Sequence, residues 1–148
     1  MTDFSAITML ISGGLFVGGV VSIAWERLPV WRATEVSDFR VGFAHTLRRV
    51  DRIQPALIAV CLISTIGFAL GSGGVKQVAA LVAAGGFLVV LIGSGVFLVP
   101  VQRRLVSSEP ELSPPETERL RRLWLRGHLV RTVVALAAFV LVVVATVA

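Results

Sequence analysis

Four long runs of apolar residues dominate the chain, and polar residues collect in the segments between them. The runs cover residues 4–24, 53–70, 78–99 and 129–148, and Arg131 is the only charged residue in any of them. Each run is close to the roughly 20 residues that a helix needs to cross a bilayer core of about 30 Å. Backbone polar groups must be satisfied inside lipid, and the alternating pattern of a membrane β-strand is absent, so the pattern predicts membrane helices.

The composition agrees with this interpretation. Hydrophobic residues make up 55% of the 148 residues and charged residues only 16%, against about 25% charged residues in a typical soluble domain. The mean hydropathy is +0.87. We therefore predict an all-α protein of one domain, residues 1–148, folded as a four-helix transmembrane up-and-down bundle.

The net charge of +5 is distributed very unevenly, and this predicts an orientation. All arginines lie in residues 26–52 and 102–131, whereas the connection between the second and third runs carries only Lys76. The positive-inside rule places both arginine-rich segments in the cytoplasm and both termini on the extracytoplasmic side of the cell membrane, that is, the inner or plasma membrane. The lipid bilayer is then the predicted partner, and anionic headgroups explain the pI of 11.3 without a nucleic acid. Trp25, Trp31 and Trp124 lie at the cytoplasmic edges, where indole rings favour the membrane interface.

The first arginine-rich connection contains a helical apolar stripe. Phe39, Phe43, Leu47 and Val50 follow one another at spacings of four, four and three, which predicts an amphipathic helix over residues 37–50. This cytoplasmic helix would lie against the membrane or over the mouth of the bundle. It is either a plain connector with a solvated basic face or a functional lid.

The second connection begins with prolines and acidic residues, which predict a loop. Ser113 and Glu116 then form the pattern of a capping box, with Pro114 at the first helical position. Apolar spacing continues from there into the last run. We therefore predict one long helix from about Pro115 to near the C-terminus.

Small residues recur in the first and third runs. Gly14, Gly18 and Ser22 form a ridge at spacings of four, and the third run contains Gly85, Gly86, Gly93 and Gly95. Such residues allow close approach of helices, either within the bundle or in a dimer. The single cysteine, Cys61, is expected to be a small packed hydrophobe, and the chain contains no metal-binding motif.

Five polar residues fall at the predicted cytoplasmic ends of the helices: Glu26, Asp51, Gln102, His128 and Arg131. These ends are neighbours in an up-and-down bundle, and ionisable groups at this depth favour the interior. A carboxylate beside His128 would suit a general base, and Arg131 could stabilise an oxyanion. Alternatively, Arg131 extends to the headgroups and pairs with an acid in a loop. Trp124, Gln102 and Trp25 are the residues that we expect to contact a substrate.

Several segments together resemble a known family. They are "WERLPVW", "FRVGFAHTLRRVDRIQP", "VPVQRRL" and "LWLRGHLVRTVVALAAF". They are similar to the anthrone-oxygenase-like family of small four-helix membrane proteins, most of unassigned function. The pattern aromatic-x-x-x-His-x-x-Arg-Thr, here Trp124 to Thr132, carries the resemblance most strongly. Gln102 stands two positions after Pro100, where the family tends to have Asn.

The resemblance implies an activity. A few members of the family oxidise an anthrone to an anthraquinone with molecular oxygen and need no organic cofactor. By position, His128 would be the base, Arg131 the oxyanion partner, and Glu26 or Asp51 the group that orients His128.

Two other functions fit the same sequence. The chain could be a non-catalytic accessory subunit of a larger membrane complex, or a small transporter. Transport is disfavoured because no acidic residue lies within any of the four runs. An enzyme requires an internal cavity with His128 on its wall, whereas a subunit does not.

Overall fold

The computed structural model describes residues 2–50, 53–107 and 111–147, and these ranges contain helices and short connections without a strand. The prediction of an all-α protein is confirmed. In chain order, the elements are α1 (Thr2–Ser22), the π-helical η1 (Ile23–Arg27), α2 (Leu28–Ala33), α3 (Val36–Val50), α4 (Gln54–Leu70), α5 (Gly74–Gly93), the π-helical η2 (Ser94–Leu98), α6 (Val99–Val106) and α7 (Pro114–Val147).

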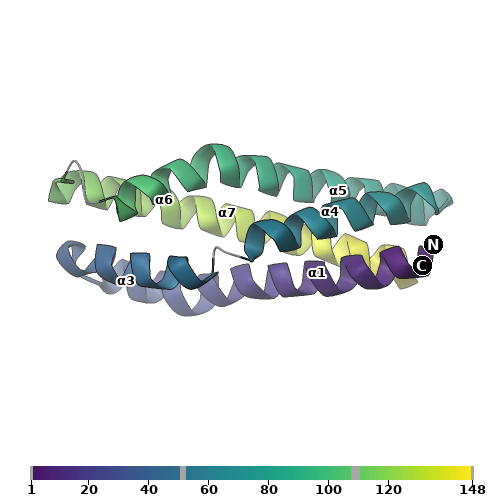
Figure 1. Ribbon diagram of the computed structural model, residues 1–148, viewed down its shortest axis with the longest axis horizontal. Helices are drawn as coiled ribbons and strands as arrows, with labels where there is room; N and C mark the ends of the chain where they lie inside the picture. Colours follow the sequence, from purple (N-terminus) through teal and green to yellow (C-terminus); the bar gives the residue numbers. More distant parts are fainter. Residues whose placement is uncertain (1, 51–52, 108–110, 148) are drawn as a thin grey trace.

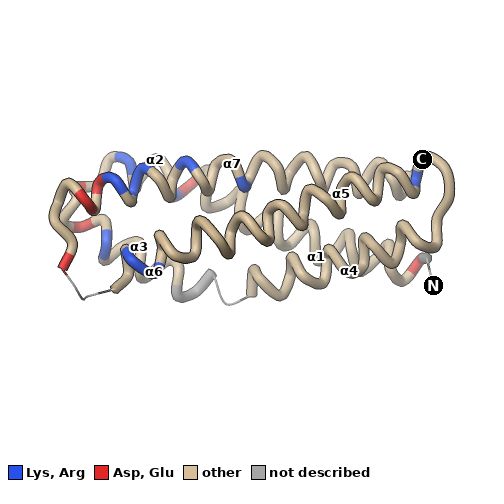
Figure 2. The backbone as a smooth tube through the Cα atoms, turned by 90° about the horizontal axis from the view of Figure 1, so that it is seen from above, with Lys and Arg blue, Asp and Glu red and all other residues tan. Residues whose placement is uncertain are grey.

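The helices form an elongated molecule with two halves (Figure 1). In the half that holds both termini, α1 contacts α4 and α7, and α5 contacts the same two helices. In the other half, α2 and α6 continue α1 and α5, α3 runs back toward α4, and α3 contacts α6 and α7. Figure 2 shows that most of the charged residues gather in this second half, so the molecule is divided into a largely apolar half and a polar half.

The apolar half is built to lie in a membrane. Among the residues that the structure describes, three segments are long and apolar enough to cross one, Asp3–Ala33, Gly74–Val106 and Pro114–Val147, and Gln54–Leu70 is a shorter apolar helix. The 34 residues of α7 extend over about 51 Å at 1.5 Å per residue. A bilayer core is only about 30 Å thick, so part of α7 must project beyond it as the polar half.

Two π-turns, which the apolar pattern did not predict, interrupt the long helices directly before a proline. The N–H of Leu28 donates to the carbonyl of Ile23, and the N–H of Val99 donates to the carbonyl of Ser94. Both bonds span five residues instead of four. Pro29 and Pro100 come next, and a proline ring clashes with the carbonyl four residues before it. Widening the helix by one residue relieves this clash without ending the helix.

Both helices predicted in the connections are present. The N–H of Glu116 donates to Ser113 Oγ at 3.4 Å, and α7 begins at Pro114. The amphipathic helix is α3, and its apolar residues Phe39, Phe43 and Leu47 are buried. These side chains pack against α2, α6 and α7 in the polar half, so the stripe faces the protein.

The centre of the polar half is an aromatic cluster of Trp31, Phe39, Phe43 and Trp124. The rings of Phe43 and Trp124 are 4.9 Å apart and those of Trp31 and Phe43 5.2 Å, both edge to face, which is a favoured geometry. Trp31 and Trp124 are only 4% and 2% exposed. Both rings therefore pack against α3 within the protein, and their position at the membrane interface stays a prediction. Trp25 is exposed.

Close approach of the membrane helices depends on glycines only partly as predicted. A Cβ on Gly86 would lie 2.9 Å from Cβ of Ala138, and one on Gly13 would lie 3.0 Å from Sγ of Cys61, which is buried as expected. A Cβ on Gly18 would meet nothing within 4 Å. No close helix contact therefore forms at Gly18 of the predicted ridge on α1. Such a contact forms at Gly13, which lies on the core side of the same helix.

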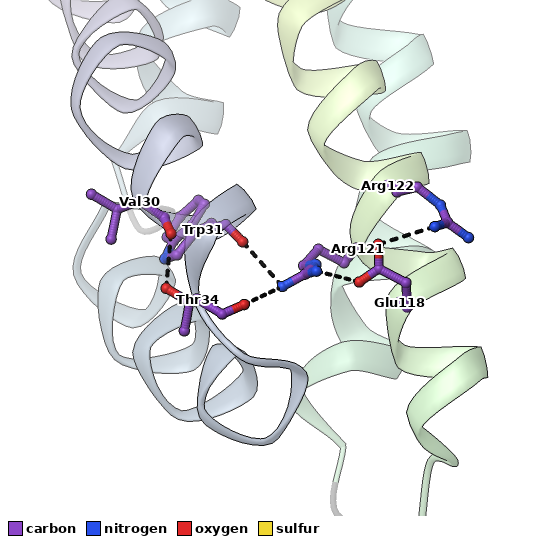
Figure 3. A network of polar contacts seen from close by, with 6 residues as sticks. All are labelled: Val30, Trp31, Thr34, Glu118, Arg121 and Arg122. Carbon is purple, nitrogen blue, oxygen red and sulfur yellow. Dashed lines mark hydrogen bonds and ion pairs between the residues drawn. The ribbon is translucent and has the colours of Figure 1, made fainter.

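An arginine of α7 caps the end of α2 (Figure 3). Nη1 of Arg121 donates to the carbonyl oxygens of Trp31 at 3.2 Å and Thr34 at 2.6 Å. The same guanidinium forms an ion pair with Glu118, and Glu118 also pairs with Arg122 at 3.1 Å. The last carbonyls of a helix have no partner within the helix and carry its negative dipole end. Arg121 supplies both the hydrogen bonds and the positive charge.

A second arginine does the same for α6. Nε of Arg40 in α3 donates to the carbonyl of Leu105 at 3.0 Å, and its Nη2 donates to the carbonyl of Ser107. Both extensions of the membrane helices therefore end against an arginine that is distant in the sequence. Sequence reasoning had assigned Arg40 only to a basic surface.

We expect Arg121→Gln to lower the free energy of unfolding by about 2–4 kcal/mol, because it leaves the carbonyls of Trp31 and Thr34 without their donor and removes one of the two ion-pair partners of Glu118. The matched control is Arg122→Gln, whose side chain is 60% exposed and whose ion pair contributes less than about 1 kcal/mol. Unfolding in mixed detergent micelles measures both values. Equal losses for the two variants would contradict the capping role.

Candidate functional site

A cavity of about 390 Å³ lies where the apolar half meets the polar half. Every one of the long helical bodies contributes to its wall, since residues come from α1, α4, α5 with η2 and α6, and α7. The lining residues are Phe16, Gln54, Pro55, Ile58, Leu91, Ser94, Gly95, Leu98, Val99, Gln102, Arg103 and Arg131. Seven of these twelve residues are apolar or glycine, and the other five are polar.

Gln54 is the most unusual group in this cavity. Its side chain is only 6% exposed, and neither its amide oxygen nor its amide nitrogen has a hydrogen-bond partner among the described residues. A Cβ on Gly19 would lie 2.9 Å from Nε2 of Gln54, so the amide occupies space that the glycine leaves. An unpartnered buried amide costs about 1–3 kcal/mol. The group therefore marks a position where a polar ligand atom or a water molecule would be stabilised.

His128 lies behind the cavity wall and is fully buried. Its Nε2 is 3.1 Å from the carbonyl oxygen of Val20, and its Nδ1 is 3.0 Å from Nη2 of Arg131. A carbonyl only accepts and a guanidinium only donates, so the ring is neutral and carries its proton on Nε2. Trp124 stacks on the imidazole at 4.9 Å. His128 thus holds Arg131, whose guanidinium extends to the cavity.

The structure brings together two of the predicted site residues on the cavity wall, Arg131 and Gln102. The expectation that His128 lies on the wall of the cavity is wrong, because His128 and Trp124 stand behind Arg131 and support it. Asp51 lies outside the described residues.

Trp25 and Glu26 are exposed, and neither lies on the cavity wall. The expectation that Glu26 orients His128 is wrong, because Val20 and Arg131 hold the two ring nitrogens. The physical reason is the π-turn: Ile23 and Leu28, five residues apart, are both buried. The residues between them, including Trp25 and Glu26, are turned outward.

Sequence reasoning missed Gln54 and Ser94. Gln54 was counted within an apolar run, although a lone amide directly before Pro55 at a helix start was visible in the sequence. Ser94 lies within a run of apolar residues and begins a π-turn, which the apolar pattern did not predict. The sequence signal for that turn was Pro100, which follows an apolar helix without a loop between them.

The arrangement of these groups favours binding of a partly apolar molecule with an oxygen atom that carries negative charge. A guanidinium presents a planar set of N–H donors, two amides supply further donors and acceptors, and apolar walls exclude water and strengthen each polar contact. Among the described residues, no three His, Cys, Asp or Glu side chains gather in a way that could hold a metal ion.

Comparison with known proteins identifies one family. The family model described as anthrone oxygenase matches residues 43–141, which is more than half of the chain. This range includes Gln54, Ser94, Gln102, His128 and Arg131. The chain matches no curated protein and no solved structure.

We expect His128→Leu to lower the free energy of unfolding by about 2–3 kcal/mol, because the Val20 carbonyl and the Arg131 guanidinium both lose their buried partner. His128→Gln offers a donor and an acceptor at similar reach and should lose less than half of this. Thermal unfolding in detergent ranks the three proteins. Equal losses in both variants would mean that the ring contributes by packing on Trp124 and not by its hydrogen bonds.

Proposed function

Since the chain belongs to the anthrone oxygenase family, we propose that it is a membrane oxygenase for an anthrone-like or other aromatic small molecule. The observation that carries this proposal is that Arg131, Gln102 and the unpartnered amide of Gln54 line one cavity. Its mixture of apolar wall and polar groups is typical of small-molecule sites.

The reaction requires the removal of a proton before oxygen can react. An anthrone loses a proton from its methylene carbon and becomes an anthranolate, whose negative charge lies largely on oxygen. This electron-rich anion reduces molecular oxygen, the co-substrate, and the methylene carbon becomes a carbonyl. The balanced reaction converts one anthrone and one O₂ into one anthraquinone and one water. The chemistry is driven by the substrate's own anion, so the proposal includes no organic cofactor.

Arg131 has the central role in this proposal. Its guanidinium would bind the anthranolate oxygen, and stabilisation of such an oxyanion is commonly the largest catalytic contribution of a protein. The amides of Gln54 and Gln102 would bind other oxygen atoms of the ring system. The apolar wall would exclude water and so favour the charged contacts.

His128 is the proposed base, and its hydrogen bond to Arg131 determines when it can accept a proton. Nδ1 accepts a hydrogen bond from Arg131, so its lone pair is engaged while the cavity is empty of an oxyanion. When Nη2 of Arg131 turns toward the substrate oxygen, Nδ1 is released and can accept a proton. His128 would therefore both position Arg131 and act as base in the substrate complex.

We also propose that α4 crosses the membrane as a fourth helix. Its 17 residues reach about 25 Å at 1.5 Å per residue, which is the lower limit for a spanning helix. Both arginine-rich segments then lie in the cytoplasm and both termini outside. The cavity would lie at the level of the cytoplasmic leaflet, within reach of an apolar substrate dissolved in the membrane.

This topology predicts opposite labelling of two connections. A cysteine at position 73, between α4 and α5, should react with a membrane-impermeant maleimide added to intact cells, and a cysteine at position 111, before α7, should react only after the cells are opened. Mass spectrometry of the purified chain reads the result. Labelling of position 111 but not of position 73 in intact cells would reverse the orientation.

For the activity, we expect Arg131→Lys to lower kcat for oxidation of a hydroxylated anthrone by about 100-fold, because an ammonium does not reproduce the planar donor set. Arg119→Lys, the same change at an exposed position of α7, is the control and should retain full activity. Gln54→Leu should lower turnover without lowering the melting temperature, since it removes an unpartnered buried amide. Oxygen uptake and anthraquinone absorbance in nanodiscs measure all three variants.

The alternative, a non-catalytic subunit of a larger complex, predicts a different result. The wild-type protein would then consume no oxygen with any anthrone tested. Arg131→Lys would change recovery of the complex from the membrane and not turnover.

A further inference from the structure

Two further hollows meet at one residue, and the larger of them shares Ser94, Leu98 and Arg131 with the wall of the Gln54 cavity. A cleft of about 390 Å³ is lined by Arg32, Glu118, Arg121, Arg122, Leu125 and Arg126. A larger groove of about 560 Å³ separates α7 from α5, η2 and α6, and its wall is almost entirely apolar. Arg126 lines both hollows. We propose that they form one binding site for an anionic phospholipid, with the phosphate in the cleft and an acyl chain in the groove.

The charge of the cleft suits a phosphate group. Its wall carries four guanidinium groups and one carboxylate. Arg121 is committed to the end of α2, and Glu118 is held by Arg121 and Arg122, as Figure 3 shows. Within the described ranges, Arg32 and Arg126 form no side-chain hydrogen bond or ion pair with another residue, so their N–H donors are available to a ligand. Arginine forks match phosphate oxygens closely, and basic pockets beside membrane helices bind anionic headgroups.

The groove suits an acyl chain. Along α5, η2 and α6 its lining residues run from Val89 to Val101, a length of about 18 Å at 1.5 Å per residue. Val130 and Val134 of α7 line the opposite wall. A Cβ on Gly93, within the groove, would meet nothing within 4 Å, so the glycine leaves room for a ligand.

The arrangement of the two hollows favours a phospholipid over other occupants. The cleft lies in the charged half of the molecule and the groove extends into the apolar half. A phospholipid in a membrane has a matching arrangement, because its charged headgroup lies at the surface and its acyl chains extend into the apolar core. A soluble anion would use only the cleft, and an uncharged apolar molecule would use only the groove. This site does not depend on the proposed oxygenase activity.

The experiment uses the full-length protein in detergent and measures, by native mass spectrometry, its affinity for phosphatidylglycerol and for phosphatidylcholine with the same acyl chains. The wild type should prefer phosphatidylglycerol. Arg32→Gln and Arg126→Gln should each weaken phosphatidylglycerol binding about fivefold, from the contribution of one arginine near the headgroups. Arg119→Gln, an equal change of charge on an exposed position of α7, should have no effect.

A second pair of variants tests the groove. Gly93→Phe places a ring in the groove and should weaken binding of phosphatidylglycerol, whereas Gly85→Phe, at an exposed position of the same helix where a Cβ also meets nothing within 4 Å, should not. Equal affinity of the wild type for the two lipids, or an equal effect of Arg119→Gln and Arg126→Gln, would overturn the proposal. Unchanged binding in Gly93→Phe would also overturn it, because the cleft would then bind a phosphate group alone.

Discussion

The polar half of the molecule depends on the hydrogen bonds that Arg121 donates to the last carbonyls of α2. A helix end carries unpaired carbonyls and a partial negative charge, and α2 ends against protein rather than in solvent. Arg121, itself only 8% exposed, reaches from α7 to satisfy this end, and Arg40 does the same for α6. These two contacts join the extensions of α1 and α5 to helices that are distant in the sequence, and they allow the chain to continue as packed helix beyond the bilayer.

The same constraint reaches the cavity through a series of contacts. With α2 held in place, Trp31 packs on Phe43 and Trp124, and Trp124 stacks on His128. His128 bonds to the Val20 carbonyl on one side and to Arg131 on the other. The guanidinium of Arg131 is thereby held at the wall that also carries Gln54 and Gln102. A neutral imidazole between a carbonyl and a guanidinium has every hydrogen-bonding atom satisfied, which makes its complete burial acceptable.

The two prolines have an effect that goes beyond local geometry. Ser94 and Leu98, the first and last residues of the π-turn before Pro100, both line the cavity. The π-turn before Pro29 keeps Ile23 and Leu28 in the core and turns Trp25 and Glu26 outward. π-Turns within α-helices are frequent at functional sites. In this protein the π-turn before Pro100 supplies part of the cavity wall, and the π-turn before Pro29 directs Trp25 and Glu26 away from the cavity.

The sequence by itself determined the all-α class, the membrane helices, the start of α7 and the helical nature of α3, because each of these depends on local spacing, capping and the length of apolar runs. It also singled out Arg131, Gln102 and His128 as inward polar groups at one level of the molecule. Only the tertiary structure decided that His128 bonds to Val20 and Arg131 instead of Glu26, that Gln54 lies unpartnered in the cavity, and that Arg40 and Arg121 cap helices. The bonds from Arg40, Arg121 and His128 to backbone carbonyls join residues 65 to 108 positions apart. A one-residue change of helical phase at a π-turn redirects side chains that a regular 3.6-residue period places elsewhere.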